Sequence, residues 1–221
     1  MREIFRKYAR FLVISCTIIV VQSSSITPEY LVPSTYQAVE YIQSSWTQYI
    51  STWYNPKQNT EFEIEYEIVS YNQRYSVPMW TRKDHNIQAF YFWYENNNNS
   101  YYWFWNNKAD PSSVAFHWIW VRRKITYHNN TLSNWTQSVN VATNQQPYWT
   151  ILIFWERHDW NAQELGAMKL YMFTLREWTT KKYEFIPCYR KSDSVIWLRD
   201  RIWKSFYTNA WSWSFTKWPN K

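Results

Sequence analysis

Glycine is almost missing from this chain of 221 residues, in which Gly166 is the single example. An average protein of this length contains about 15 glycines. Glycine takes positive φ without a steric cost, so a chain that lacks it has few favourable ways to form tight turns. The same chain contains 18 tryptophans. The two residue types together approach an ordinary glycine content.

We therefore interpret most of the tryptophans as positions at which the protein of the source organism has glycine. Many of them stand beside turn-forming residues, where glycine is favoured and a bulky indole is not. Such a sequence arises when the codon UGA, read as glycine in the source, is translated as tryptophan. The alternative is a protein that is genuinely rich in tryptophan, and UGG codons at most of these positions would favour it.

A long hydrophobic run is absent as well. The apolar run Phe11–Val21 has 11 residues, whereas a membrane-spanning helix needs about 20. Basic residues precede this run and the small, polar segment Gln22–Ser25 follows it, which is the pattern of a secretory signal peptide over residues 1–25. An uncleaved anchor and a lipoprotein attached through Cys16 are the alternatives. We expect a secreted or cell-surface protein with no stable membrane span after cleavage.

The number of cysteines and the net charge exclude further classes of protein. After cleavage Cys188 is the remaining cysteine, so no internal disulfide can form, and its apolar neighbours predict a buried thiol. Residues 1–25 have a net charge of +3, which leaves about +4 of the formal +7 for the rest. This mild charge forms no basic stripe, so we expect no nucleic-acid partner.

The remaining sequence predicts strands. No segment combines helical periodicity with capping residues. Thr60–Val69 alternates apolar residues with Glu61, Glu63, Glu65 and Glu67, as in a strand with one buried and one solvated face. Further strands are predicted at 87–94, 101–105, 121–127, 150–155 and 167–175, with turns or loops at 95–100, 128–136 and 156–161. Strands at this spacing predict an all-β, two-sheet antiparallel sandwich.

Three blocks carry a resemblance to a known family. They are 39–54 with the strand 61–68, then 150–175, and finally 185–215. With glycines restored, residues from about 31 to 219 resemble the bacterial concanavalin A-like, or laminin-G-like, jelly-roll proteins. The chain departs from the family pattern by having tryptophan where the family has glycine, at Trp46, Trp53, Trp155, Trp197, Trp203, Trp211 and Trp213.

The resemblance implies a jelly-roll domain over residues 39–221, after a lead-in segment at 26–38. It also implies a non-catalytic, lectin-like surface or secreted module whose partner is an extracellular glycan or a surface protein. It supplies no shared catalytic residues and no cofactor, and it leaves calcium binding open. A structural surface or phage-particle module is an alternative function.

A second alternative is a glycan hydrolase of the same fold. Glu63, Glu65 and Glu67 share one strand face, and glycosidic hydrolysis uses paired carboxylates. The alternation also includes Glu61, which favours a solvated face. If the chain is an enzyme, Glu63 and Glu67 are the expected catalytic pair.

The loop at 156–161 is the predicted ligand site because polar side chains gather there at a strand end, a frequent place for binding residues. The candidates are Glu156, Arg157, His158, Asp159 and Asn161. A plain solvated connection is the competing interpretation. The four histidines lack zinc-ligand spacing, so no metal site is predicted. The high aromatic content is no argument for sugar stacking if the tryptophans stand for glycine.

Overall fold

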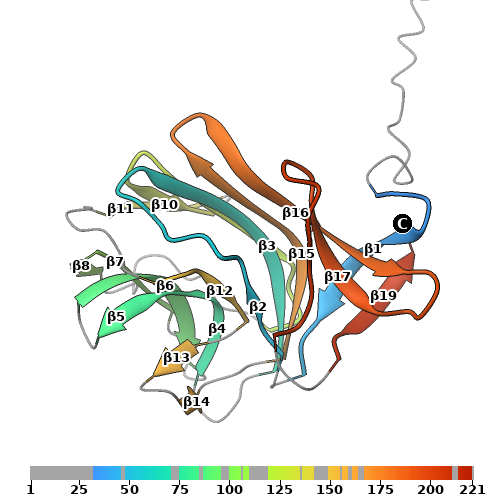
Figure 1. Ribbon diagram of the computed structural model, residues 1–221. Helices are drawn as coiled ribbons and strands as arrows, with labels where there is room; N and C mark the ends of the chain where they lie inside the picture. Colours follow the sequence, from blue (N-terminus) through green and yellow to red (C-terminus); the bar gives the residue numbers. More distant parts are fainter. Residues whose placement is uncertain are drawn as a thin grey trace, which may run out of the picture.

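The structure is a computed structural model that describes residues 32–45, 48–70, 75–84, 87–95, 100–105, 107–109, 119–134, 136–141, 149–154, 156–158, 161–163, 167–210 and 214–220. Within these ranges the chain forms strands and turns and no helix, and every strand pairing is antiparallel. The all-β prediction is confirmed, and the arrangement is consistent with a β-sandwich (Figure 1). The predicted signal peptide lies outside the described residues.

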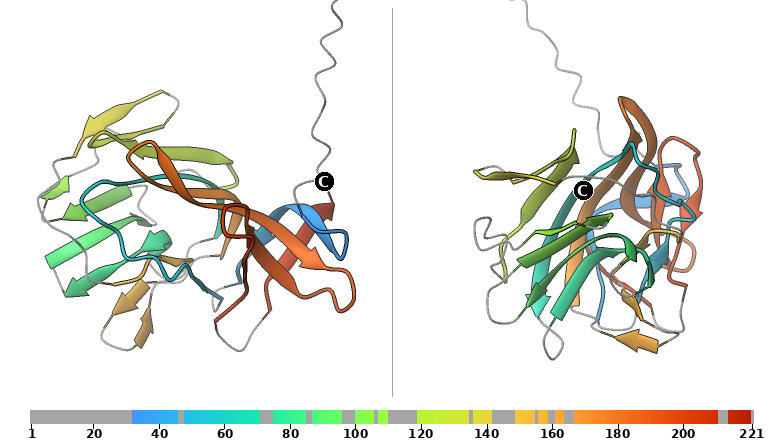
Figure 2. Two further views of the ribbon diagram at one scale, coloured as in Figure 1. Left: turned by 45° about the horizontal axis from the view of Figure 1, so that its top comes forward. Right: turned by 90° about the vertical axis from the view of Figure 1, so that its left-hand side faces the viewer.

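The larger sheet has ten strands and curves over one side of the molecule (Figures 1 and 2). Its order is β11-β10-β9-β3-β15-β1-β16-β17-β18, and β19 pairs with β1. The strands are β1 (Tyr36–Gln43), β3 (Thr60–Ser70), β9 (Arg123–His128), β10 (Thr131–Ser133), β11 (Ser138–Asn140), β15 (Ala167–Glu177), β16 (Thr180–Arg190), β17 (Ile196–Asp200), β18 (Phe206–Tyr207) and β19 (Thr216–Asn220). β1 begins within the predicted lead-in segment.

The smaller sheet has seven strands in the order β2-β12-β4-β6-β7-β8, with β5 paired to β6. They are β2 (Ile50–Ser51), β4 (Tyr75–Trp80), β5 (Arg82–Asp84), β6 (Ile87–Glu95), β7 (Ser100–Trp105), β8 (Asn107–Ala109) and β12 (Leu152–Ile153). β13 (Glu156–His158) and β14 (Asn161–Gln163) form a separate two-stranded hairpin.

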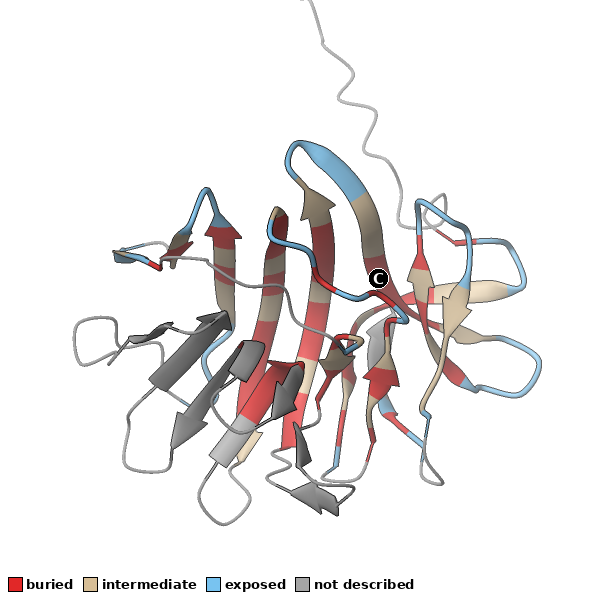
Figure 3. Cartoon of the chain, turned by 60° about the vertical axis from the view of Figure 1, so that its left-hand side comes forward, coloured by how far each residue is buried: buried red, intermediate tan, exposed pale blue. Residues whose placement is uncertain are grey.

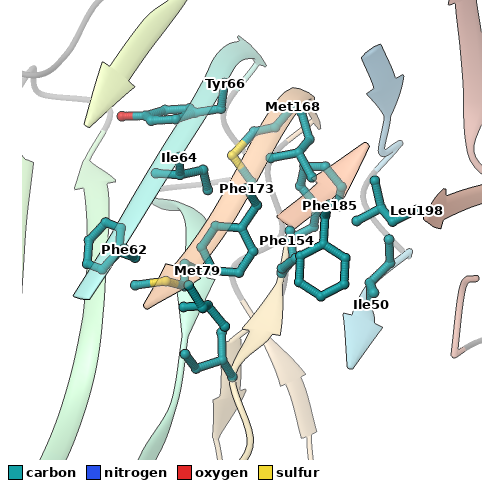
Figure 4. Packing of buried hydrophobic residues seen from close by; sticks show 14 of the residues in the cluster. Ile50, Phe62, Ile64, Tyr66, Met79, Phe154, Met168, Phe173, Phe185 and Leu198 are labelled. Atoms are coloured by element: carbon teal, nitrogen blue, oxygen red, sulfur yellow. The ribbon is translucent and has the colours of Figure 1, made fainter. Parts of the chain in front are cut away.

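The core lies between the two sheets and follows from the alternation of β3. Phe62, Ile64, Tyr66 and Ile68 are all buried, as predicted, and they join one cluster with residues of the smaller sheet (Figures 3 and 4). Phe62 of β3 meets Phe90 of β6 edge to face, with ring centroids 5.6 Å apart. Burial of large aromatic side chains from both sheets is therefore what holds them together.

Several predicted boundaries were wrong. The strand predicted at 150–155 is shortened to Leu152–Ile153, and the turn predicted at 128–136 contains β10. Asn129 and Asn130 alone connect β9 to β10, because His128 pairs with Thr131. Both asparagines have positive φ, which is the backbone of a type I′ hairpin turn and suits asparagine. Because this turn needs only two residues, the segment predicted as a turn also contains strand β10, which the sequence pattern did not predict.

Among the residues that the structure describes, three tryptophans occupy the left-handed backbone region. Trp53, Trp120 and Trp178 have φ of 57°, 63° and 53°, and each side chain is largely exposed. Two other positions at which the family has glycine do not have positive φ themselves. Trp197 lies in β17 without positive φ, and next to Trp203 it is Lys204 that has φ of 59°. Trp46, Trp155, Trp211 and Trp213 lie outside the described residues.

Cys188 is buried on the outer face of the larger sheet. It packs with Val32 and Ala38, and Tyr36, Trp197 and Phe206 close over this small cluster. Burial raises the pKa of its thiol to about 12. The thiolate that nucleophilic chemistry needs is therefore scarce at neutral pH, and the predicted burial of the thiol is confirmed.

Candidate functional site

The predicted ligand residues lie on a hairpin instead of a loop. Glu156, Arg157 and His158 belong to β13 and Asn161 belongs to β14, while Asp159 lies outside the described residues. Glu156 pairs with Gln163 and His158 pairs with Asn161, so backbone pairing was mistaken for an open connection. This hairpin and the β15–β16 turn lie at opposite ends of the molecule (Figures 1 and 2).

The glutamates of β3 lie on the face of the larger sheet away from the core, and Glu63, Glu65 and Glu67 each have a cationic partner. Glu63 pairs with Lys124, with the carboxylate oxygen 2.8 Å from Nζ, and Glu65 pairs with Arg122 at 2.6 Å. Glu67 is buried, and it accepts hydrogen bonds from the Lys169 ammonium and the Tyr171 hydroxyl, both at 2.8 Å. These contacts form a row of side-chain ion pairs along β3 and the chain segments beside it.

A pocket of about 620 Å³ opens at the end of the sheet where β15 turns into β16. Strand register brings its parts together, because Thr60 pairs with Glu177 and Phe62 pairs with Tyr127. Three connections far apart in sequence surround it, namely the loop before β3, the β9–β10 turn and the β15–β16 turn. The lining residues are Lys57, Gln58, Asn59, Thr60, Glu61, Tyr127, Asn129, Asn130 and Trp178.

One wall of the pocket is organised by Glu61. Its carboxylate is buried; one oxygen lies 2.6 Å from Nδ1 of His128 and the other accepts a hydrogen bond from the Asn129 amide N–H at 3.1 Å. The Tyr127 hydroxyl donates to Oδ1 of Asn130 at 3.3 Å. These bonds fix the β9–β10 turn, so the two asparagine side chains are presented by a rigid backbone.

The part of the pocket lined by Lys57 and Thr60 is organised by Glu177, which is mostly buried. Its Oε1 lies 2.8 Å from Nζ of Lys57 and accepts a hydrogen bond from the Tyr54 hydroxyl at 3.1 Å, and its Oε2 lies 3.3 Å from Nζ of Lys182. Thr60 closes this network through its hydroxyl, 2.8 Å from that of Tyr54. The contact with Lys57, followed by those with Tyr54 and Lys182, holds the pKa of Glu177 below its usual value.

Acid should therefore weaken the protein partly through Glu177. A carboxyl whose pKa is lowered by folding contributes stability above its ordinary pKa of 4.5, and this contribution is lost as the pH falls through the lower folded value. Between about pH 5 and pH 3 we expect the urea midpoint of the unmodified protein to fall more steeply than that of Glu177→Gln. Parallel pH profiles for the two proteins would contradict this.

The charged groups that line the pocket each have a partner, and the remaining lining groups are mostly amides and hydroxyls. Lys57 is paired with Glu177, and Glu61 lies against His128. Within the described ranges no group of three acidic, histidine or cysteine side chains could hold a metal ion. The pocket can therefore offer hydrogen-bond donors and acceptors to an uncharged polar ligand.

Sequence reasoning missed this pocket, although two signals pointed to its parts. Asn55-Pro56 marks the loop before β3, and Asn129-Asn130 is a pair typical of tight hairpin turns. Nothing in the sequence indicated that these turns meet, since that depends on the pairing of β3 with both β9 and β15.

No helix among the described residues is long and apolar enough to cross a bilayer. Comparisons with protein-family profiles, with curated proteins and with solved structures found no match for this chain.

Proposed function

We propose that this protein is a secreted or cell-surface, non-catalytic module that binds an extracellular glycan in the pocket at the β15–β16 end. Its fold in this proposal is a jelly roll of the concanavalin A-like type. The observation that carries the proposal is the pocket itself, lined by amides and hydroxyls and framed by the side-chain contacts of Glu61 and Glu177.

The size and composition of the pocket favour a ligand of one or two sugar rings. Small-molecule sites generally enclose about 300–1,000 Å³, and this pocket has about 620 Å³. Sugar hydroxyls both donate and accept hydrogen bonds, as do the side-chain amides of Gln58, Asn59 and Asn129. Because Lys57 is paired with Glu177 and the Glu61 carboxylate is bonded by His128 and the Asn129 amide, the pocket favours a neutral sugar over a sialylated or sulfated one.

The proposal is tested on an array of neutral, sialylated and sulfated oligosaccharides. Gln58 is exposed and lines the pocket, so Gln58→Ala should weaken binding of the neutral oligosaccharides about tenfold, as loss of a hydrogen bond to a ligand does. Gln137→Ala is the matched control, because Gln137 is exposed outside the pocket lining. A blank array, or equal losses in both variants, would refute the proposal.

The same preparation separates the two alternative functions. Cleavage of β-glucan by the unmodified protein, lost in Glu63→Gln, would favour the hydrolase. A blank array together with an absence of cleavage would favour the structural surface module.

A further inference from the structure

We propose that residues 53, 120 and 178 are glycine in the native protein, and that its pocket consequently has no aromatic platform. The second half of this inference rests on the proposed glycan-binding function. The first half stands on backbone geometry alone, and the two halves are tested separately.

Residue 178 provides the most direct argument. Glu177 pairs with Thr180, so Trp178 and Thr179 form a two-residue hairpin loop. Trp178 has φ of 53° and Thr179 does not have positive φ. Positive φ at the first central residue alone is the pattern of a type II′ turn, which has glycine at that position. The Trp178 amide N–H donates to the Asn59 carbonyl at 3.1 Å, which fixes this backbone in place.

Residues 53 and 120 have the same backbone requirement in other settings. Ile151 accepts from the Thr52 amide and donates to the Tyr54 carbonyl, so residue 53 bulges out of the ladder with φ of 57°. Such bulges favour glycine. Residue 120 has φ of 63°, and its amide donates to the Ile68 carbonyl at 2.8 Å. A bulky residue in this region is a conformational outlier.

The side chains at these three positions gain little stability from burial that could offset the backbone strain. Trp53, Trp120 and Trp178 are 77%, 62% and 64% exposed, so their indoles bury little apolar area. Trp80 and Trp197 differ, because neither has positive φ, Trp80 is buried in β4 and Trp197 packs against Phe206. Where the chain needs two left-handed residues at the β9–β10 turn, it has asparagines. Strain without compensating burial separates positions 53, 120 and 178 from the buried tryptophans.

Glycine at 178 changes the pocket. Trp178 is its one tryptophan among the described lining residues, which also include Gln58 and Asn59. Without the indole, the native pocket is wider on that side and recognises the edges of a sugar through hydrogen bonds. The other aromatic lining residue, Tyr127, is 2% exposed and stacks on Phe62, so stacking of a sugar face on an exposed ring has no part in binding.

The first test compares the melting temperature of the chain as written with that of W53G/W120G/W178G. We expect the triple variant to melt higher by about 2–4 °C for each replaced residue, because each replacement relieves a left-handed bulky residue. W80G and W197G are the controls, and each should melt lower because it removes a packed side chain. A triple variant that is no more stable than the parent would overturn the assignment.

The second test does not depend on folding. Trypsin releases residues 177–181 of the protein isolated from its source, since Arg176 and Lys181 flank the cleavage sites. A peptide mass that fits glycine at 178 supports the proposal, and a mass that fits tryptophan overturns it.

The third test concerns the pocket. Fluorescent neutral glucose, galactose and mannose oligosaccharides should bind W178G within about threefold of the parent, whereas loss of a stacking ring would weaken binding tenfold or more. A loss of tenfold or more would overturn the proposal that the pocket binds sugars without an aromatic platform. If none of these sugars binds either protein, the glycan function fails, while the melting temperatures and the peptide mass still decide which residues are native.

Discussion

Replacing Phe173 by alanine should lower the free energy of unfolding by about 3–5 kcal/mol. Phe173 lies on β15 at the centre of the larger sheet, where it pairs with Ile64 of β3 and with Phe185 of β16. It is fully buried, and its ring stacks on that of Phe185 with centroids 5.9 Å apart and planes 8° apart. Truncation removes the apolar burial and leaves a cavity that the flanking strands cannot close.

Urea unfolding followed by fluorescence measures the effect. Phe173→Leu keeps most of the volume and should cost less than about 1.5 kcal/mol. Phe206→Ala is the matched control, because Phe206 is half-buried and stacks on Tyr36 on the outer face of the sheet, with ring centroids 4.1 Å apart. Equal losses at Phe173 and Phe206 would mean that the core between the sheets does not dominate stability.

The sequence predicts such core positions well because a strand alternates with a period of two. The order of residues 60–69 alone indicated that Phe62, Ile64, Tyr66 and Ile68 are buried, and the structure agrees, but Glu61 and Glu67 on the face predicted to be solvated are buried as well. The limits of 87–94 and 167–175 are likewise close to those of β6 and β15. In these segments local pattern and tertiary burial favour the same conformation, so no long-range information was needed.

The candidate site was not predictable in the same way. Polar runs at 55–59, 129–130 and 156–161 are alike in composition, and the sequence offered no reason to prefer the first two. The structure distinguishes them through strand pairing, because β3 lies between β9 and β15 and brings their turns to the same end. Residues 156–158 and 161–163 instead pair with each other. Sites built from several turns depend on topology, which single-segment patterns do not contain.

Asp200→Ala should cost about 3 kcal/mol, because it removes three hydrogen bonds to one side chain and each contributes about 1 kcal/mol. Asp200 is fully buried at the end of β17, where its carboxylate accepts three backbone N–H bonds. Oδ1 accepts from Glu184 and Ile202, both at 3.0 Å, and Oδ2 accepts from Trp203 at 3.2 Å. The side chain thus ties the 201–204 loop to β16, and alanine would leave all three donors without this acceptor.

Asn at position 200 tests whether these three bonds account for the effect. Asp200→Asn keeps an oxygen for Glu184 and Ile202 but turns an N–H₂ group toward the Trp203 amide, so its urea midpoint should lie between those of the parent and Asp200→Ala. Asp193→Ala is the matched control in the preceding loop, where Asp193 is exposed and bonds Arg190 and the Val195 amide. Exposed pairs of this kind contribute little, so its midpoint should hardly move. Equal midpoints for Asp200→Asn and Asp200→Ala would show that the buried charge, and not the number of backbone bonds, determines the stability of this loop.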